Sequence, residues 1–502
     1  MRAASKGAAE GAIRAPRVRV PHAVALPLLA LIVLLLLVIV RLPWAGDLGI
    51  HAATIERLRA DPLDPGNPLV DADTPSPYYS PWTLLLGCLA RVTGLGTFVV
   101  LRVAALVGLA LLVTGVRSFV RTFSTRPGAV PLALLCLLLL WGPGLFNWSG
   151  FLGLNSLALT VSYPSTFALG LSFHFWALLR KALPGAGVRA FLGLGVLWAV
   201  ILLSHQFTGV VASFGASAMV LGARPWPSRE VWGRLACGAA LGIAVLALWP
   251  YYSFFGLFGA GGLEDIHRSL YRGLLPHFGL ALLGVAALVC RWRRDRRDPL
   301  VLFFAFGAVL FAAGGLSGHY SWGRVLPAAL IPAQVAAALE VFERGAVRRA
   351  AAALLGAALL LGAWTQAGTL GYVAPRGALP GPVAAKYRVP WPGYDWLAPE
   401  VRHGDVVMAK TFPSRQIPAY GPYTVAPGYP DFFLPDQDKR LAAVRTYFAP
   451  DTRRGTRLAV LHRYGVRWII AYPTDHGLPP DDPALRKTSV GPRGQVLYEV
   501  VG

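Results

Sequence analysis

Long apolar runs, separated by short polar loops, make up most of the chain. A helix that crosses a bilayer needs about 17–25 mainly apolar residues. Runs of this kind predict membrane-spanning helices near residues 22–40, 98–116, 128–143, 160–180, 189–204, 207–223, 234–254, 274–290, 299–316, 324–341 and 350–367. The pattern therefore predicts an α-helical polytopic membrane protein with about 11 transmembrane helices.

Two further apolar stretches, at residues 78–95 and 151–159, are not counted as spans. Counting the first as a full span would reverse the sidedness of everything after it. We therefore interpret both as helices that lie on the outer membrane surface or enter it only halfway.

Lysine and arginine test this arrangement, because they gather in cytoplasmic loops. With the N-terminus inside, basic residues concentrate in the inner segments, at residues 1–21, 117–126, 180–189, 224–234, 291–297 and 344–349. The first apolar run has no small-residue cleavage site after it, which favours an uncleaved first helix. We predict a cytoplasmic basic N-terminus at 1–21, a transmembrane domain at 22–371, and an extracytoplasmic region at 372–502, in the plasma membrane.

Composition agrees with this class. Of 502 residues, 55% are apolar and only 14% are charged, which excludes an ordinary soluble enzyme. The net charge of +22 is accounted for largely by topology, so it does not require nucleic acid as a partner. The four cysteines lie in apolar segments without paired spacing, which indicates packing rather than disulfides or metal ligands.

The pattern changes at about residue 372, where proline, tyrosine, aspartate and arginine replace the apolar runs. Alternating apolar positions predict strands at 406–409, 423–426, 467–472 and 496–500 and helices at about 436–448 and 452–464. Residues 372–502 are therefore predicted to form a small α/β domain that buries its own core.

Two outer loops hold most of the candidate chemistry. The loop at 41–97 carries Asp47, His51, Glu56, Asp61, Asp64, Asp71, Asp73, Tyr78, Tyr79 and Trp82, and the loop at 255–273 carries Glu264, Asp265, His267, Arg268 and Arg272. Asp47 follows the first predicted span directly, where an ionisable group is costly and tends to have a function. Its other interpretation is an N-cap of the helix that begins near Leu48.

Two polar sites interrupt later spans. Arg324 opens the tenth predicted span, at a depth where a guanidinium can grip a phosphate group in a fork. Its other interpretation is an anchoring side chain that reaches into the headgroups. His205 lies between Ser204 and Gln206 in an apolar region, where polar groups are costly in free energy unless they are satisfied, which makes it a site candidate. Its other interpretation is a hydrogen-bonded structural histidine.

These features, in this order, resemble the GT-C superfamily of integral-membrane glycosyltransferases. The resemblance rests on the outer loops and the exported domain, and on the short motifs Trp44-Ala45-Gly46-Asp47, Tyr78 to Trp82, Ser204-His205-Gln206 and Gly323-Arg324-Val325-Leu326-Pro327. It implies a lipid-linked sugar donor of the polyprenyl-phosphate type and an extracytoplasmic glycan, lipid or protein acceptor, with the bilayer as the third partner.

The resemblance also implies roles for single residues. Asp47 matches the position of the catalytic acidic residue. The positions of Arg324, Arg268 and Arg272, rather than the resemblance, make them the expected ligands of the donor phosphate. For Arg268 and Arg272 the other interpretation is an exposed interfacial helix with ordinary charge pairs. The expected substrate-binding residues are His51, Tyr78, Tyr79, His205, Glu264, Asp265, His319, Tyr320 and Trp322. Many members carry a second acid, but the neighbour of Asp47 is Gly46, so Glu264 or Asp265 takes that role or it is absent. A divalent cation, held by Asp47, Glu264 and Asp265, stays open as a cofactor.

Other functions remain open at this point. The chain contains no phosphate-binding Walker loop, dinucleotide fingerprint, zinc spacing or serine nucleophile motif. A transporter or translocase of lipid-linked sugars is one alternative, although the spans show no inverted repeat. A non-catalytic partner in envelope polysaccharide assembly is another.

Overall fold

The computed structural model describes residues 22–259, 261–262, 264–342 and 348–501. The basic segment 1–21, for which we expect a cytoplasmic position, lies outside the described residues, as does Arg344 of the predicted inner loop. Everything below concerns the described part of the chain.

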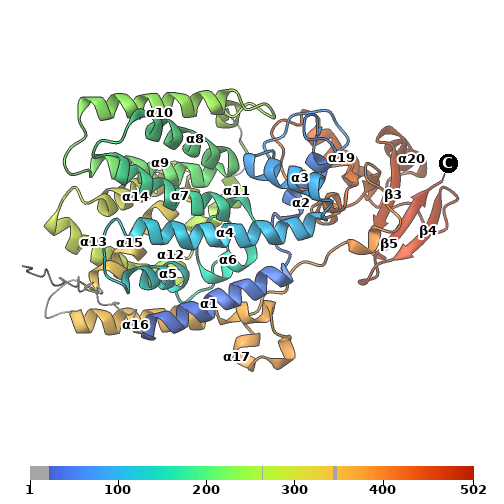
Figure 1. The fold of residues 1–502 in the computed structure, drawn as a ribbon. Helices are drawn as coiled ribbons and strands as arrows, with labels where there is room; N and C mark the ends of the chain where they lie inside the picture. The colour runs from blue at the N-terminus through green and yellow to red at the C-terminus, as the bar shows by residue number, and fades with distance from the viewer. Residues whose placement is uncertain (1–21, 260, 263, 343–347, 502) are drawn as a thin grey trace, which may run out of the picture.

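A bundle of long helices forms the body of the molecule (Figure 1). These helices are α1 (His22–Arg41), α4 (Thr97–Val120), α5 (Ala129–Leu139), α7 (Pro164–Ala182), α8 (Val188–Ser204), α9 (Gln206–Leu221), α10 (Arg229–Ala247), α13 (Leu282–Arg294), α14 (Pro299–Ser317), α15 (Pro327–Glu340) and α16 (Arg348–Thr365). Shorter helices join them: α6 (Leu154–Thr160), α11 (Glu264–His267), α12 (Leu274–Phe278) and the 3-10 turn η4 (Tyr320–Val325).

Glycines let neighbouring helices of the bundle approach closely. A Cβ atom on Gly195 of α8 would lie 1.9 Å from the carbonyl oxygen of Gly238 of α10, closer than two such atoms can come. Small residues of this kind drive helix association in a bilayer, where the lipid is as apolar as the side chains. Some of the scattered glycines of the sequence therefore serve packing at such contacts.

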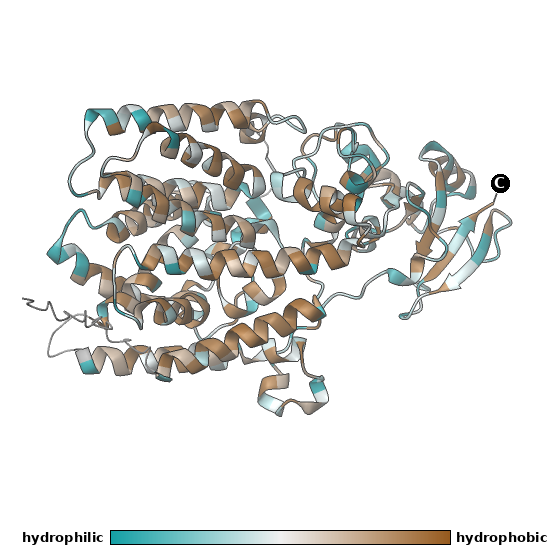
Figure 2. Ribbon diagram, viewed as in Figure 1, coloured by the Kyte–Doolittle hydropathy of each residue, from teal (hydrophilic) through white to brown (hydrophobic). Residues whose placement is uncertain are grey.

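The helices make the chain a multi-pass membrane protein. Among the described residues, 6 helices are long and apolar enough to cross a membrane, and four apolar helices are shorter, namely α5, α8, α9 and α16. Figure 2 shows hydrophobic residues along the long helices and hydrophilic residues gathered in the loops at their ends. Each of the predicted spans coincides with a helix of the bundle, but the number that cross the membrane stays a prediction.

The loop at 41–97 contains two short helices, α2 (Leu48–Ala60) and α3 (Pro81–Thr93). Each has only 13 residues, which is too short for a span. Ser80 caps α3 by accepting a hydrogen bond from the backbone N–H of Thr83, and Gly94 ends the helix in the left-handed conformation. Figure 1 shows α2 and α3 between the bundle and the C-terminal region.

The C-terminal region contains a five-stranded sheet of order β2-β1-β3-β5-β4. Its strands are β1 (Val406–Met408), β2 (Tyr423–Thr424), β3 (Val466–Ala471), β4 (Leu485–Val490) and β5 (Val496–Val500), and its helices are α17 (Gly381–Ala384), α18 (Thr411–Ser414), α19 (Gln437–Tyr447) and α20 (Arg454–Arg463). β1 pairs in parallel with β2 and β3, whereas β5 pairs antiparallel with β3 and β4. Strand β4 was not predicted, because its residues alternate poorly and are mostly polar.

The C-terminal region docks on the outer loop through buried polar contacts. Arg57 of α2, only 2% exposed, donates a hydrogen bond to the carbonyl oxygen of Pro422 (2.9 Å) and stacks on Tyr423 at 3.5 Å. The backbone N–H of Thr424 donates to the carbonyl oxygen of Leu69 at 2.9 Å. These contacts fix the loop that carries Asp47 against residues that lie 355 and 365 positions later in the chain.

Candidate active site

Asp47 lies in a tight turn between α1 and α2. Three successive carbonyl oxygens of this turn accept hydrogen bonds from remote segments: Trp44 from the N–H of Trp391 (2.7 Å), Ala45 from the Tyr163 hydroxyl, and Gly46 from the Tyr429 hydroxyl (2.8 Å). Gly46 has a φ of 50°, in the left-handed region that favours glycine. The position of Asp47 is therefore set by α7 and by the C-terminal region, in addition to the first helix.

The Asp47 carboxylate faces a space that water can reach. It occupies the N-cap position of α2 but accepts no capping hydrogen bond, so the interpretation as a simple helix cap is not what the structure shows. Its side chain keeps exposed surface, yet so much protein surrounds it that desolvation raises the pKa of the carboxyl. The positive charges of Arg324 and Arg415 oppose this shift by favouring the ionised form.

Arg324 lies in η4, just before α15, and its charge acts on Asp47. It is 7% exposed and lies between two aromatic rings, at 4.6 Å from the centroid of Phe207 and 5.7 Å from that of Trp148. Its Nε atom is buried and has no hydrogen-bond partner among the described residues. A side chain buried in this way does not reach out to the headgroups, so the anchoring interpretation does not fit its position.

His205 places a second donor beside Arg324. Its Nδ1 atom accepts a hydrogen bond from the backbone N–H of Thr208 (3.2 Å), and the Thr208 hydroxyl lies 2.8 Å from the same nitrogen. In a neutral imidazole the proton then sits on Nε2. Nε2 lies 3.4 Å from an Arg324 Nη atom, which is also a donor. Two adjacent donors that cannot bond to each other both need an acceptor, and an anionic ligand would supply it.

His51 lies on α2 one turn after Asp47. Its ring packs edge-on against Trp82 and Tyr163, at centroid distances of 5.6 and 4.8 Å. Desolvation lowers the pKa of His51 to about 3, so the imidazole is neutral at physiological pH. His51 therefore adds no charge to the surroundings of Asp47.

Arg415, from the turn after α18, completes the group and was not found from the sequence. Its charge acts on Asp47, its Nε donates to the carbonyl oxygen of Gly428 (3.0 Å), and its guanidinium lies 5.6 Å from the ring of Tyr429. The C-terminal region is rich in arginine, so no local signal distinguished this one. Only the docking of that region onto α2 brings it to the site.

The two expected tyrosines have different surroundings. Tyr79 is 2% exposed and donates its hydroxyl to the carbonyl oxygen of Gly66 (2.9 Å), which makes it part of the loop's own packing. Tyr78 is half-buried and donates to the carbonyl oxygen of Pro430 (2.6 Å) in the C-terminal region. Its surroundings include the charges of Asp47 and Arg415, so Tyr78 lies nearer the site than Tyr79 does.

The charged residues of the second outer loop lie around η4, the turn that carries Arg324. Glu264 accepts hydrogen bonds from the backbone N–H and the hydroxyl of Ser321, both at 2.8 Å. Arg268 is exposed and lies 5.4 Å from the ring of Tyr320, and Asp265 and Arg272 are exposed as well. This loop therefore supports Arg324 from outside, and none of these three exposed charges has a described contact with Asp47.

His319 and Trp322 stack on each other at 5.0 Å and are both exposed.

His267 was noted as part of the loop's charged cluster but not as a candidate site residue. It is only 5% exposed and packs on the same two rings as Arg324, at 5.8 Å from Trp148 and 5.6 Å from Phe207. The aromatic pair thus joins the outer loop to Arg324.

The acidic residues considered for a cation do not form a ligand set. In the described part of the chain, no group of three or more His, Cys, Asp and Glu side chains lies close enough to hold a metal ion. Both carboxylate oxygens of Glu264 bond to Ser321, and Asp47 has two guanidinium groups in its vicinity. The residues present therefore do not fit a divalent cation, and no step below uses one.

Known proteins share this fold although their sequences differ. No family model and no curated protein matches the sequence. The structure is similar to that of ArnT from Cupriavidus metallidurans in the apo state, with a TM-score of 0.57 at 15% identity, covering 95% of this chain and 97% of that one. It is similar to the arabinofuranosyltransferase AftD from Mycobacteria, with a TM-score of 0.57 at 17% identity, covering 95% of this chain and 40% of AftD.

Both proteins are GT-C superfamily glycosyltransferases. The expected GT-C fold is therefore confirmed, and the chain spans less than half of AftD. At these identities the likeness concerns the fold alone.

Proposed function

We propose that this protein is a membrane glycosyltransferase that transfers a sugar from a polyprenyl-phosphate donor to an extracytoplasmic glycan, lipid or protein acceptor. The observation that carries the proposal is the buried, unpaired Nε of Arg324, with the Nε2 of His205 beside the same guanidinium, near the carboxylate of Asp47. Anion-binding donors beside a potential base are what displacement of a sugar from a phosphate requires.

The proposed reaction is a single displacement with inversion. The acceptor hydroxyl oxygen attacks the anomeric carbon while the bond from that carbon to the phosphate oxygen breaks. Asp47 takes the hydroxyl proton, and the polyprenyl phosphate leaves with the bonding electrons. Arg324 and the Nε2–H of His205 hold the leaving phosphate, whose negative charge grows as the bond breaks.

The electrostatics of Asp47 suit a base. Desolvation raises the pKa of its carboxyl, which makes the carboxylate a stronger proton acceptor. The guanidinium groups of Arg324 and Arg415 limit this rise, because they favour the ionised form of the carboxyl. In this proposal Arg415 keeps Asp47 charged and gives the C-terminal domain, residues 372–502, a direct part in the site.

The other candidate residues take supporting roles in the proposal. His51 and Tyr78 border the space next to Asp47, where the acceptor would lie. Glu264 and the loop that includes Arg268 and Arg272 hold η4 in place and border the route by which the lipid-linked donor enters. Topologically, the proposal needs the site at the extracytoplasmic face, with the N-terminus in the cytoplasm.

The test is a transfer assay on the purified full-length protein in liposomes. Polyprenyl-phosphate donors with labelled hexoses and pentoses are offered with envelope glycans, and release of the sugar to water is measured as well. We expect Asp47→Asn to lower transfer by roughly 10²–10⁴-fold, the usual contribution of a general base. The matched control is Asp64→Asn, an exposed acid of the same loop, which should keep wild-type activity.

Wild-type activity in the Asp47→Asn variant would refute the assignment of the base. Movement of the labelled donor across the bilayer, without transfer to any acceptor, would instead identify a translocase.

A further inference from the structure

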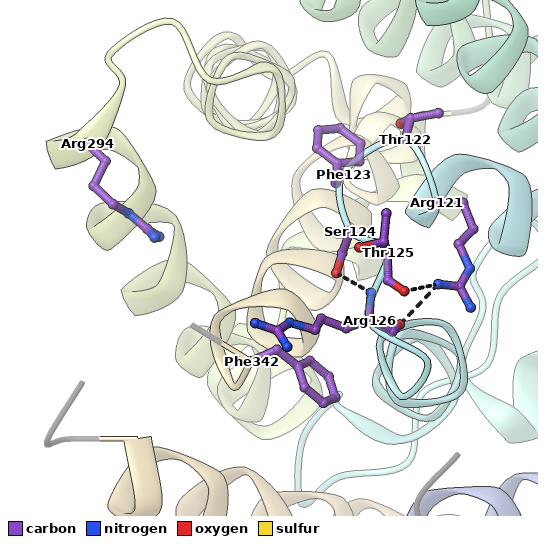
Figure 3. Close-up of a pocket in the computed structure, with 8 residues that line it drawn as sticks. All are labelled: Arg121, Thr122, Phe123, Ser124, Thr125, Arg126, Arg294 and Phe342. Carbon is purple, nitrogen blue, oxygen red and sulfur yellow. Dashed lines mark hydrogen bonds between the residues drawn. The ribbon is translucent and has the colours of Figure 1, made fainter. Parts of the chain in front are cut away.

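A pocket of about 660 Å³ opens at the end of the bundle opposite to Asp47. It is lined by the loop 121–126 between α4 and α5, by Arg294 at the end of α13, and by Phe342 after α15 (Figure 3). The Nε of Arg102, early in α4, donates to the carbonyl oxygen of Val40, close to the turn with Asp47. Arg121 follows the last residue of α4, so about 28 Å of helix separates it from Arg102.

The loop presents arginine and hydroxyl donors on a fixed backbone. Arg121 donates from one Nη atom to the carbonyl oxygens of Thr125 (2.7 Å) and Arg126 (3.2 Å), which closes the loop and leaves its other N–H groups for a ligand. Ser124 Oγ accepts from the backbone N–H of Arg126 (3.2 Å), so its own proton can be donated elsewhere. Among the described residues, the Arg126 guanidinium has no hydrogen bond or ion pair.

The acidic groups near the pocket are already paired with other arginines. Glu340 bonds to Arg291 at 3.3 Å and also to Arg294. Asp298 bonds to Arg291 at 2.6 Å. The positive charges of Arg121 and Arg126 therefore remain uncompensated by the described residues.

The walls of the pocket are partly apolar. Phe123 and Phe342 line it together with the arginines. Figure 2 shows hydrophobic residues along the long helices of the bundle. Phosphate groups of a bilayer lie at the depth where spanning helices end. The pocket thus combines cationic donors, a hydroxyl and aromatic surface at the level of the lipid headgroups.

We propose that this pocket binds the headgroup of an anionic phospholipid. The phosphodiester lies between Arg121 and Arg126, the Ser124 hydroxyl bonds to a headgroup oxygen, and the acyl chains run along the bundle from Phe123 and Phe342. A soluble phosphate ester that enters from the water offers the same charge chemistry, so the test separates the two sources. The site is distinct from the proposed catalytic site and does not depend on it.

The experiment measures lipid binding to the full-length protein in neutral detergent by native mass spectrometry. Phosphatidylglycerol is compared with phosphatidylcholine, and glycerol phosphate is added as a soluble competitor. The variants are Arg126→Gln, whose side chain holds no other described part of the protein, and the double variant Arg121→Gln with Arg126→Gln. The control is Arg229→Gln, an exposed arginine at the same end that does not line the pocket.

We expect preferential binding of phosphatidylglycerol, a fall in its affinity of about fivefold for Arg126→Gln, and a larger fall for the double variant. The control should bind as the wild type does. Equal binding of the two lipids would overturn the proposal, and so would an equal loss in the control. Displacement of the lipid by glycerol phosphate at comparable concentration would overturn it in favour of a soluble ligand.

Discussion

Arginines gather at both ends of the helical bundle, but in opposite surroundings. Arg324 is 7% exposed, lies between aromatic rings and has an unpaired Nε atom, whereas Arg121 and Arg126 are exposed around an open pocket. A charge in surroundings of low dielectric constant interacts strongly with its neighbours and costs much desolvation free energy. An exposed charge keeps its hydration, and salt screens its interactions. The same side chain is therefore suited to chemistry at one end and to loose lipid binding at the other.

The largest effect should come from removing the charge of Arg324, the enclosed arginine. We expect Arg324→Ala to lower kcat/KM for the donor by about 10–100-fold, because a hydrogen bond to a charged group contributes about 1.5–3 kcal/mol. Steady-state transfer kinetics with varied donor concentration measure this effect.

Arg324→Lys should recover only part of the loss, since an ammonium cannot form the fork. Arg376→Ala, at an exposed arginine of the C-terminal region, is the control, and an equal loss in both variants would remove the distinction between enclosed and exposed arginines.

The docking of the C-terminal region can be weakened at one glycine. A Cβ atom on Gly49 would lie 1.8 Å from the carbonyl oxygen of Arg415, so Gly49→Ala should lower the free energy of unfolding by about 1–3 kcal/mol. Thermal unfolding of the purified protein checks this.

Gly356→Ala in α16 is the matched control, because a Cβ atom there meets nothing within 4 Å. If both variants melt like the wild type, the close approach of α2 to Arg415 is not formed.

The pH dependence reports on Arg415. The activity proposed for Asp47 needs its ionised form, so it is lost as the pH falls through the raised pKa of this carboxyl. Arg415 lowers that pKa, and Arg415→Gln should therefore move the acid limb of the profile of kcat/KM to higher pH and reduce activity at neutral pH by up to about tenfold.

Arg415→Lys keeps the charge and should keep the acid limb near its wild-type position. Coincident acid limbs for wild type and Arg415→Gln would show that Arg415 does not act on the base.

The smallest effect should come from salt. Raising sodium chloride from 0.1 to about 0.5 M shortens the screening length from about 10 Å to roughly 4 Å. We expect phosphatidylglycerol binding at the Arg121 and Arg126 pocket to weaken several-fold, while the KM for the donor changes less than twofold. Parallel titrations of both ligands check this, and equal salt dependence would contradict the difference in surroundings.

Sequence patterns were informative for charged residues at the ends of apolar runs, because a charge close to the bilayer is costly in free energy and tends to have a function. Asp47 and Arg324 stood out because each follows or opens an apolar run, and the structure brings their charges together. Arg415 and His267 did not stand out, because their contact with the site depends on how separate segments dock. His319 and Trp322 had the right composition and position along the chain, but both are exposed and stack on each other, without a described contact to Asp47.

The three hydrogen bonds that hold the turn before Asp47 have a consequence for biosynthesis. The first helix leaves the ribosome before all others, yet the groups that shape its outer end come from Tyr163, Trp391 and Tyr429. The turn cannot reach its final form until the last quarter of the chain has been made and folded. A chain that stops after the bundle would lack two of these three hydrogen bonds, so the position of Asp47 is settled only when synthesis is nearly complete.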